Sequence, residues 1–317
     1  MITKPMHVLK QYPVRKSKQQ KSEFRDAAVG YFENIGYKVA IESGSLGAKN
    51  IVVGNPETAK YLVTAHYDTP ACMLIPNLIT PCHLLPFILW QIFMTLLLLA
   101  PGILVGTIVG HLANDFLIGF NSAYIFFLIE SILMIAGPAN PNNANDNTSG
   151  VVAVMDVAYN LPKEYRDRVC FVLFDLEEVG LIGSASYAKK HAKVVKHQVV
   201  LNMDCVGNGL DIVFFPSSKF RKNSIRMKWL CQWDSMWTDG RRISIRKSGF
   251  MFYPSDQMNF PLGIGISALE KNRFGWLYCD RVHTKKDVIL DDKNISVLQQ
   301  CIISMIQHDR LLVITQK

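Results

Sequence analysis

The stretch VCFVLFDLEEVG, residues 169–180, carries the strongest structural signal in the chain. Its first half is a continuous apolar run, as expected of a strand buried on both faces of a parallel sheet. Its second half places Asp175, Glu177 and Glu178 directly after that strand. In open sheets flanked by helices, functional sites gather at the carboxyl ends of the strands. This stretch therefore predicts an α/β fold with acidic side chains at one edge of its sheet.

Periodicity and turn residues predict alternating helices and strands on both sides of this stretch. Before it we expect a helix over 22–37, strands over 38–42, 50–53 and 61–65, and a helix over 150–161 with Ser149 as its N-cap. After it we expect helices over 184–195, 218–237 and 293–312, and strands over 198–203, 211–215 and 243–252. Such alternation is typical of a layered α/β fold around a central sheet.

The composition of the 317 residues excludes a disordered, collagen-like or coiled-coil chain, because 49% are hydrophobic and 19% charged. The formal net charge is +8, but no nucleic-acid-binding motif accompanies the basic residues, so no nucleic-acid partner is predicted. Seven cysteines without a C-x-x-C pair indicate neither a disulfide scaffold nor a zinc finger. They favour a reduced, cytosol-facing protein.

The hydrophobic excess lies in residues 84–137, which contain no Lys or Arg. Segments 84–109 and 116–137 are each long enough to cross a bilayer as a helix, and 110–115 is a polar break. We predict a transmembrane hairpin inserted into a soluble, basic domain made of 1–83 and 138–317, with the lipid bilayer as partner. The alternatives are an apolar lid or a dimer interface. Glu130 should face the partner helix or a polar cavity, because a carboxylate is costly in lipid.

Membrane orientation is predicted from charge. Residues 1–21 are basic and lack an apolar core, so they do not resemble a signal peptide. The hairpin tip carries no Lys or Arg, whereas the N-terminal part is rich in them. Because positive residues stay on the cytoplasmic side, we expect a multi-pass membrane protein with two spanning helices and its soluble domain in the cytoplasm. The sequence makes no prediction of oligomeric state.

Five segments bearing His, Asp or Glu end predicted strands or follow them in loops. They contain His66 and Asp68, Asp146, Glu177 and Glu178, Asp204, and His283. Because strand ends share one edge of a sheet, these segments can converge on one pocket. Imidazoles and carboxylates together are the ligand set of zinc sites, and a His-x-Asp pair lets a carboxylate orient a metal-bound imidazole. Of two adjacent glutamates, one can bind metal while the other transfers protons.

These segments resemble the signature blocks of a known enzyme family, in the family's order. The blocks are AHYDT (65–69), NDNTSG (145–150), EEVGLIGS (177–184), NMD (202–204) and VHT (282–284). They are similar to those of the co-catalytic di-zinc exopeptidases, metallopeptidase family twenty-eight, which holds bacterial leucine-type aminopeptidases and glutaminyl cyclases. Three features depart from the family pattern: Leu176 stands where Gly is usual, Gln257 where His is common, and the hairpin is inserted between His66 and Asp146.

The resemblance implies a mixed β-sheet between helix layers and a cis peptide after Asp146. It also implies two zinc ions, although other divalent metals can bind such ligands. One ion would be held by Asp146, Glu178 and His283, and the other by His66, Asp146 and Asp204. Asp68 would orient His66, and Glu177 would act as general base and then general acid. The substrate would be a short peptide that loses its N-terminal residue.

Two other functions fit the same resemblance. One is a glutaminyl-cyclase-like acyltransferase, which needs one zinc ion, and the other is a non-catalytic membrane scaffold. Two weaker patterns also have alternative readings. Trp229, Trp233 and Trp237 share one face of the expected helix, which indicates core packing or an aromatic belt at the bilayer. Cys205 is a packed thiol or a soft metal ligand.

Overall fold

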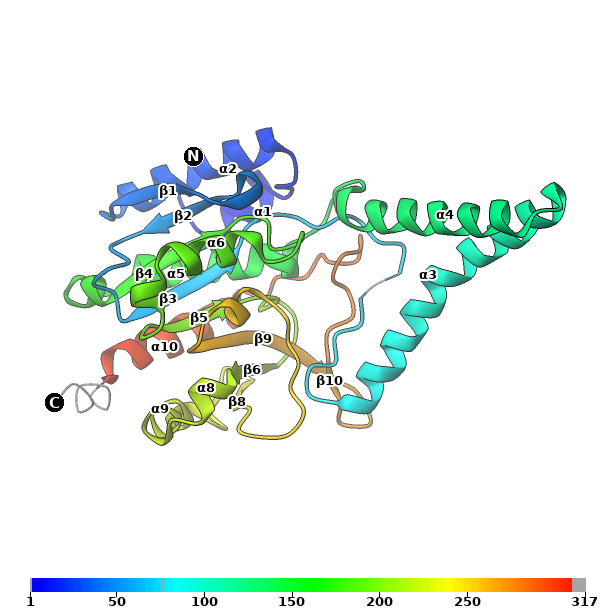
Figure 1. Cartoon of the computed structure of the whole chain (residues 1–317). Coiled ribbons are helices and arrows are strands. Elements are labelled where there is room, and N and C mark those ends of the chain that lie inside the picture. Colours follow the sequence, from blue (N-terminus) through cyan, green and yellow to red (C-terminus); the bar gives the residue numbers. More distant parts are fainter. Residues whose placement is uncertain (1, 76, 310–317) are drawn as a thin grey trace.

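A mixed ten-stranded sheet forms the centre of the molecule, and a long helical hairpin projects from it (Figure 1). The computed structural model describes residues 2–75 and 77–309. The strands follow the order β1-β2-β4-β3-β5-β9-β6-β8-β7, with β10 paired to β9. Their bounds are β1 Val39–Ser43, β2 Lys49–Val53, β3 Tyr61–His66, β4 Val169–Phe174, β5 Val199–Met203, β6 Asp211–Pro216, β7 Trp237–Thr238, β8 Arg241–Ile245, β9 Gly263–Lys271 and β10 Leu277–Tyr278. The predicted α/β fold with a mixed sheet is confirmed.

The centre of the sheet is parallel. Strand β3 pairs in parallel with β4 on one side and β5 on the other, and β5 pairs in parallel with β9. The register aligns His66 with Phe174 and Thr64 with Asn202. The carboxyl ends of β3, β4 and β5 therefore lie at one edge of the sheet. Every residue of these three strands is buried, as the continuous apolar run of β4 predicts.

Helices cover both faces of the sheet. One core packs the sheet against α2 (Lys18–Asn34), α5 (Gly150–Asn160) and α10 (Asp292–Gln307), and a second packs its other face against α6 (Ile182–Lys190) and α7 (Ala192–Val195). The remaining helices outside the hairpin are short: α1 His7–Gln11, α8 Ser218–Arg221 and α9 Ser224–Leu230. Helix α2 begins at a capping box formed by Ser17 and Gln20, which explains why it starts before the expected residue 22.

The hairpin consists of α3 (Leu84–Ala113) and α4 (Phe116–Ala136), which diverge from a common tip toward the domain (Figure 1). Near the tip the two helices are in close contact, because small residues face each other there. A Cβ on Gly106 would lie 2.7 Å from the Cβ of Ala123, and one on Gly110 would lie 3.1 Å from the Cα of Gly119. Small residues at four-residue spacing allow such close packing of apolar helices.

Several sequence-based expectations are wrong in detail. Strand β9 was not predicted, although it lies between β5 and β6. Ser149 is not a side-chain cap: its hydroxyl donates to the carbonyl of Asn145 and accepts from the backbone N–H of Val206. The helix expected over 184–195 breaks at His191, and the strand expected over 243–252 ends at Ile245. Residues 310–312 of the expected last helix lie outside the described residues.

The helix expected over 218–237 is also wrong. It divides into α8 and α9 and ends at Leu230, so the three tryptophans do not share one helical face. Trp229 and Trp233 are buried in the main core, whereas Trp237 begins β7 and is 69% exposed. Core packing is therefore the correct reading for two of the three. All seven cysteines are free thiols.

Candidate metal centre

The carboxyl edge of the sheet collects all seven predicted site residues. His66 is the last residue of β3, Asp204 follows β5, and Glu177 and Glu178 follow β4. The other three lie in loops: Asp68 after β3, Asp146 before α5 and His283 after β10. His66, Asp68, Asp146 and Asp204 are buried, whereas Glu177, Glu178 and His283 are partly exposed to the adjoining cavity.

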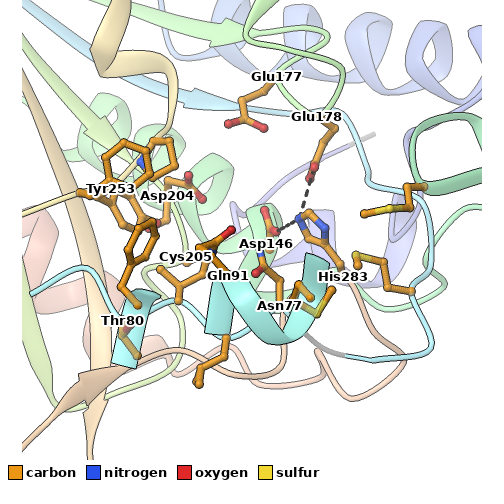
Figure 2. Close-up of a pocket in the computed structure, with 18 of the residues that line it drawn as sticks. Asn77, Thr80, Gln91, Asp146, Glu177, Glu178, Asp204, Cys205, Tyr253 and His283 are labelled. Atoms are coloured by element: carbon orange, nitrogen blue, oxygen red, sulfur yellow. Dashed lines mark hydrogen bonds and ion pairs between the residues drawn. The ribbon is translucent and has the colours of Figure 1, made fainter. Parts of the chain in front are cut away.

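Asp146 lies between the two histidines. Its Oδ1 is 3.2 Å from Nε2 of His66, and its Oδ2 is 3.1 Å from Nε2 of His283. Nε2 of His66 is also 3.8 Å from Oδ1 of Asp204. Nε2 of His283 is 3.3 Å from Oε2 of Glu178, a contact that Figure 2 marks. Each carboxylate oxygen of Asp146 therefore faces its own group of one imidazole and one further carboxylate. The peptide bond between Asp146 and Asn147 is cis, as the resemblance implies.

Asp68 supports this cluster from behind. Its Oδ1 is 3.4 Å from Nδ1 of His66, the nitrogen that points away from Asp146. The same carboxylate accepts the backbone N–H of Glu177 at 3.1 Å and that of Glu178 at 3.2 Å. One side chain thus holds the backbone of the glutamate pair by hydrogen bonds and lies beside the outer nitrogen of the His66 ring.

The electrostatics of the cluster favour a bound cation. Burial opposes protonation of His66, but Glu177, Asp146 and the other surrounding carboxylates outweigh it and raise its pKa well above the ordinary value. Burial and neighbouring carboxylates also raise the pKa of Glu177 and of Glu178. So many acidic groups at short range repel one another unless positive charge is placed among them.

Two carboxylate oxygens without hydrogen-bond partners indicate where a cation would bind. Within the described part of the chain, Oε1 of Glu178 and Oδ1 of Asp204 are buried and accept no hydrogen bond. Buried carboxylate oxygens are normally hydrogen-bonded or bind a metal ion. Ligand atoms of His66, Asp146 and Glu178 lie within 4.8 Å of one another, and so do those of Asp146, Asp204 and Cys205. The residues present therefore fit a metal centre.

Two residues that sequence reasoning missed hold the Asp146 loop in place. Asp287 accepts the backbone N–H groups of Asn145 and Asp146 at 2.7 and 2.9 Å. Arg15 is fully buried and donates to the carbonyls of Tyr12 and Tyr67 and, at 3.1 Å, to Oγ1 of Thr148. Sequence spacing does not mark either residue, because the contacts of Asp287 with Asn145 and Asp146 and those of Arg15 with Tyr67 and Thr148 span more than fifty residues. A buried arginine next to acidic ligands could be found only from the fold.

The positions that depart from the family pattern have clear local structures. Leu176 adopts φ +57°, a left-handed conformation that favours glycine, and His283 and Cys205 also have positive φ. Oε1 of Gln257 accepts from Asn202 at 3.0 Å, and its Nε2 donates to the carbonyl of Tyr253. Gln257 thus belongs to a buried hydrogen-bond network beside Asp204, and neither departure removes a predicted ligand.

A cavity of about 560 Å³ opens on the cluster. Asp146, Glu177, Glu178, Asp204 and His283 line one end (Figure 2). Residues of the hairpin line the same cavity: Phe87, Gln91, Met94, Thr95 and Leu98 of α3, and Met134 and Ile135 of α4. The predicted catalytic domain and the predicted hairpin therefore share one cavity.

A family model described as "Peptidase family M28" matches residues 131–305, more than half of the chain. The chain belongs to peptidase family M28. The match includes Asp146, Glu177, Glu178, Asp204 and His283 and confirms the family resemblance. Membership places this M28 protein among hydrolases that act on peptides. No curated protein sequence matches the chain significantly.

Solved structures share the fold of this M28 protein along most of its length. A zinc-dependent exopeptidase from Parabacteroides distasonis is 15% identical, with a TM-score of 0.59 and coverage of 96% of each chain. An aminopeptidase from Legionella pneumophila is 13% identical, with a TM-score of 0.58 and coverage of 95% of this chain and 69% of its own. A glutaminyl cyclase from Bacteroides thetaiotaomicron is 15% identical, with a TM-score of 0.58 and coverage of 96% and 97%.

Proposed function

We propose that this protein is a membrane-anchored zinc aminopeptidase that removes the N-terminal residue from peptides at a centre of two metal ions. The observation that carries the proposal is the position of Asp146, whose two oxygens each face a separate imidazole and carboxylate. His66 and Asp204 would hold one ion, Glu178 and His283 the other, and Asp146 would bridge them. The family assignment and the zinc enzymes of the same fold support zinc as the metal.

Two zinc ions held there would act as Lewis acids on the scissile carbonyl and make water more acidic. The proton transfers would depend on side chains of the protein. The carboxylate of Glu177 faces the cluster (Figure 2), and one of its oxygens lies within 4.8 Å of ligand atoms of His66 and Asp204. It would therefore be placed to accept a proton from the attacking water and deliver it to the leaving amine. Asp68 holds Glu177 in place through the backbone N–H.

The proposed metal centre favours a free N-terminus over an internal peptide bond. Three of the carboxylates that line the cavity, those of Asp146, Glu178 and Asp204, would be zinc ligands, so the two ions would offset their charge. A peptide α-amine is close to its pKa at neutral pH, so part of it is neutral and could itself bind a zinc ion. An internal segment brings no such amine, and the site therefore supports exopeptidase action.

Membrane anchoring is supported by the exposed apolar surface of the hairpin and by the hydrogen bonds within its helices. Both helices are long and apolar, and almost none of their side chains are buried in the protein. All four serine and threonine side chains of the hairpin, Thr95, Thr107, Ser122 and Ser131, donate to the carbonyl four residues earlier. Hydroxyls satisfied within their own helix suit an environment without water. The absence of Lys and Arg from the tip supports a catalytic domain in the cytoplasm.

Release of the first residue from leucine amide and short peptides, by protein in lipid nanodiscs, tests the proposed activity. We expect zinc-dependent release, abolished by a chelator and restored by zinc. Conversion of N-terminal glutamine to pyroglutamate without peptide hydrolysis would instead show a glutaminyl cyclase. Neither reaction, with zinc bound, would show a non-catalytic relative.

A further inference from the structure

We infer that the substrates are apolar peptides drawn from the bilayer, whose chain beyond the first residue lies along the diverging bases of α3 and α4. This inference rests on the proposed aminopeptidase function. The observation behind it is that one cavity joins the acidic cluster to the hairpin. The α-amine would lie at the acidic end, and the following residues would lie against the apolar end.

The part of the cavity that the hairpin lines is too long to hold only one substrate side chain. Phe87, Gln91, Met94 and Leu98 lie on one face of α3 and all line the cavity. Phe87 to Leu98 spans about three helical turns, roughly 16 Å. An extended peptide advances about 3.3–3.6 Å per residue, so this face is matched to about four or five successive residues. It therefore contacts the chain that follows the scissile bond.

The cavity reaches into the part of the hairpin that faces lipid. Helix α3 has 30 residues, roughly 45 Å of helix, whereas the apolar core of a bilayer is about 30 Å thick. We place the surplus length at the domain end of α3, so that its first turns lie at the membrane surface and Leu98 lies deeper. Because the glycine contacts at the tip do not extend to the bases, the two helices are apart where the cavity opens (Figure 1).

Contacts with the domain hold both helix bases in place. The ring of Phe87 lies 5.5 Å from that of Phe250 and 5.3 Å from that of Phe252. At the other base, Nζ of Lys16 donates to the carbonyl of Ile135 at 2.9 Å. The separation of the two helix bases is therefore part of the folded structure. On the proposed path an apolar peptide enters the cavity that both bases line directly from the bilayer, without crossing water, which favours such a peptide over a polar one.

The test uses three substrates with the same first residue and protein in nanodiscs. Two are ten-residue peptides that begin with leucine, one continuing with apolar residues and one with serine and glutamine; the third is leucine amide, which has no tail. We expect kcat/KM to be at least tenfold higher for the apolar peptide than for the polar one. Equal values for the two peptides would overturn the inference.

The matched variants are Leu98→Gln, which makes the cavity wall polar, and Leu96→Gln, at a 61% exposed position that does not line the cavity. Leu98→Gln should lower the ratio of kcat/KM for the apolar peptide to kcat/KM for leucine amide about tenfold, since burying one apolar side chain has about this value. Leu96→Gln should leave this ratio unchanged. Equal loss on both substrates, or an equal effect of both variants, would contradict the inference.

Photo-cross-linking gives a readout that does not depend on turnover. A benzophenone side chain in place of Leu98 should capture a fluorescent form of the apolar peptide, whereas the same group in place of Leu96 should not. If the protein did not hydrolyse leucine amide, the proposed aminopeptidase function would be wrong. The cross-linking result would still show whether the apolar peptide binds along α3. Equal capture at both positions would show nonspecific insertion into lipid and would overturn the inference.

Discussion

Asp68 accepts the backbone N–H of Glu177 at 3.1 Å, while the same oxygen lies 3.4 Å from Nδ1 of His66. One buried carboxylate thus links a predicted metal ligand on β3 to the predicted proton-transfer residue after β4. The catalytic geometry depends on two neighbouring parallel strands ending at the same level. A change at Asp68 should therefore affect both metal binding and turnover, although Asp68 is not a predicted ligand.

Asp68→Ala should lower zinc affinity about 10- to 100-fold, the usual effect of losing the partner of a metal-bound histidine. It should also lower kcat at saturating zinc, because the backbone of Glu177 and Glu178 loses its acceptor. Zinc titration and kinetics on the same sample measure both effects. Glu164→Gln, at an exposed acid far from the sheet edge in sequence, is the control. Unchanged zinc affinity in Asp68→Ala would show that His66 does not need this partner.

Glu177→Gln should fold, bind zinc and lose at least about 100-fold in kcat, within the usual contribution of a positioned general base. The substitution keeps the shape of the side chain and removes its basicity. Glu178→Gln is the matched variant and should lose zinc instead, because Glu178 lies 3.3 Å from His283. Zinc content and kcat measured for both variants decide between the roles. The reverse pattern would mean that the two glutamates exchange roles.

Arg15→Met should lower the free energy of unfolding by about 2–4 kcal/mol, because it leaves the buried carbonyls of Tyr12 and Tyr67 without a donor. Methionine keeps much of the apolar stem, so the loss reports on the guanidinium. Thermal unfolding in nanodiscs without zinc isolates this effect from metal binding. Lys18→Met, at an exposed position, is the control and should not shift the transition. An equal transition for both variants would contradict the structural role of Arg15.

Membrane orientation is testable by labelling single cysteines in intact cells. A membrane-impermeant thiol reagent should label Asn114→Cys at the hairpin tip and leave Lys4→Cys protected until the cells are opened. The opposite labelling pattern would place the catalytic domain outside the cytoplasm. Release of the protein by alkaline carbonate would show that α3 and α4 form a lid on a peripheral protein.

Much of the central sheet could be predicted because burial on both faces leaves a simple apolar run. Strand β4 matches its predicted bounds, 169–174. Strand β9 was missed because Gly263 and Gly265 weaken the strand pattern. Both glycines lie against Gln257, and a Cβ at either position would come within 3.0 Å of it. The requirement for glycine is thus set by a residue that packs across from the strand, which sequence periodicity does not reveal.

The ligand residues could be predicted from their sequence blocks, because parallel strand ends bring such blocks together. The residues that hold these ligand residues in place could not be predicted in this way. Asp287 and Arg15 act through backbone groups more than fifty residues away, and the hydroxyl of Ser149 joins two loops rather than capping α5. The cavity that the domain and the hairpin share could not be predicted from the sequence either, because it depends on the angle at which α3 and α4 leave the domain. That angle follows from side-chain contacts at the helix bases and glycine contacts near the tip.

Metal content measured by elemental analysis of gently purified protein, in parallel with leucine amide hydrolysis, tests the central claim most directly. The account predicts two equivalents of zinc per chain in active wild-type protein. Asp146→Ala should lose both ions, because each oxygen of Asp146 faces a different group, whereas His66→Ala should lose mainly one. A firm value of one zinc per chain, with activity that does not rise when zinc is added, would contradict the account.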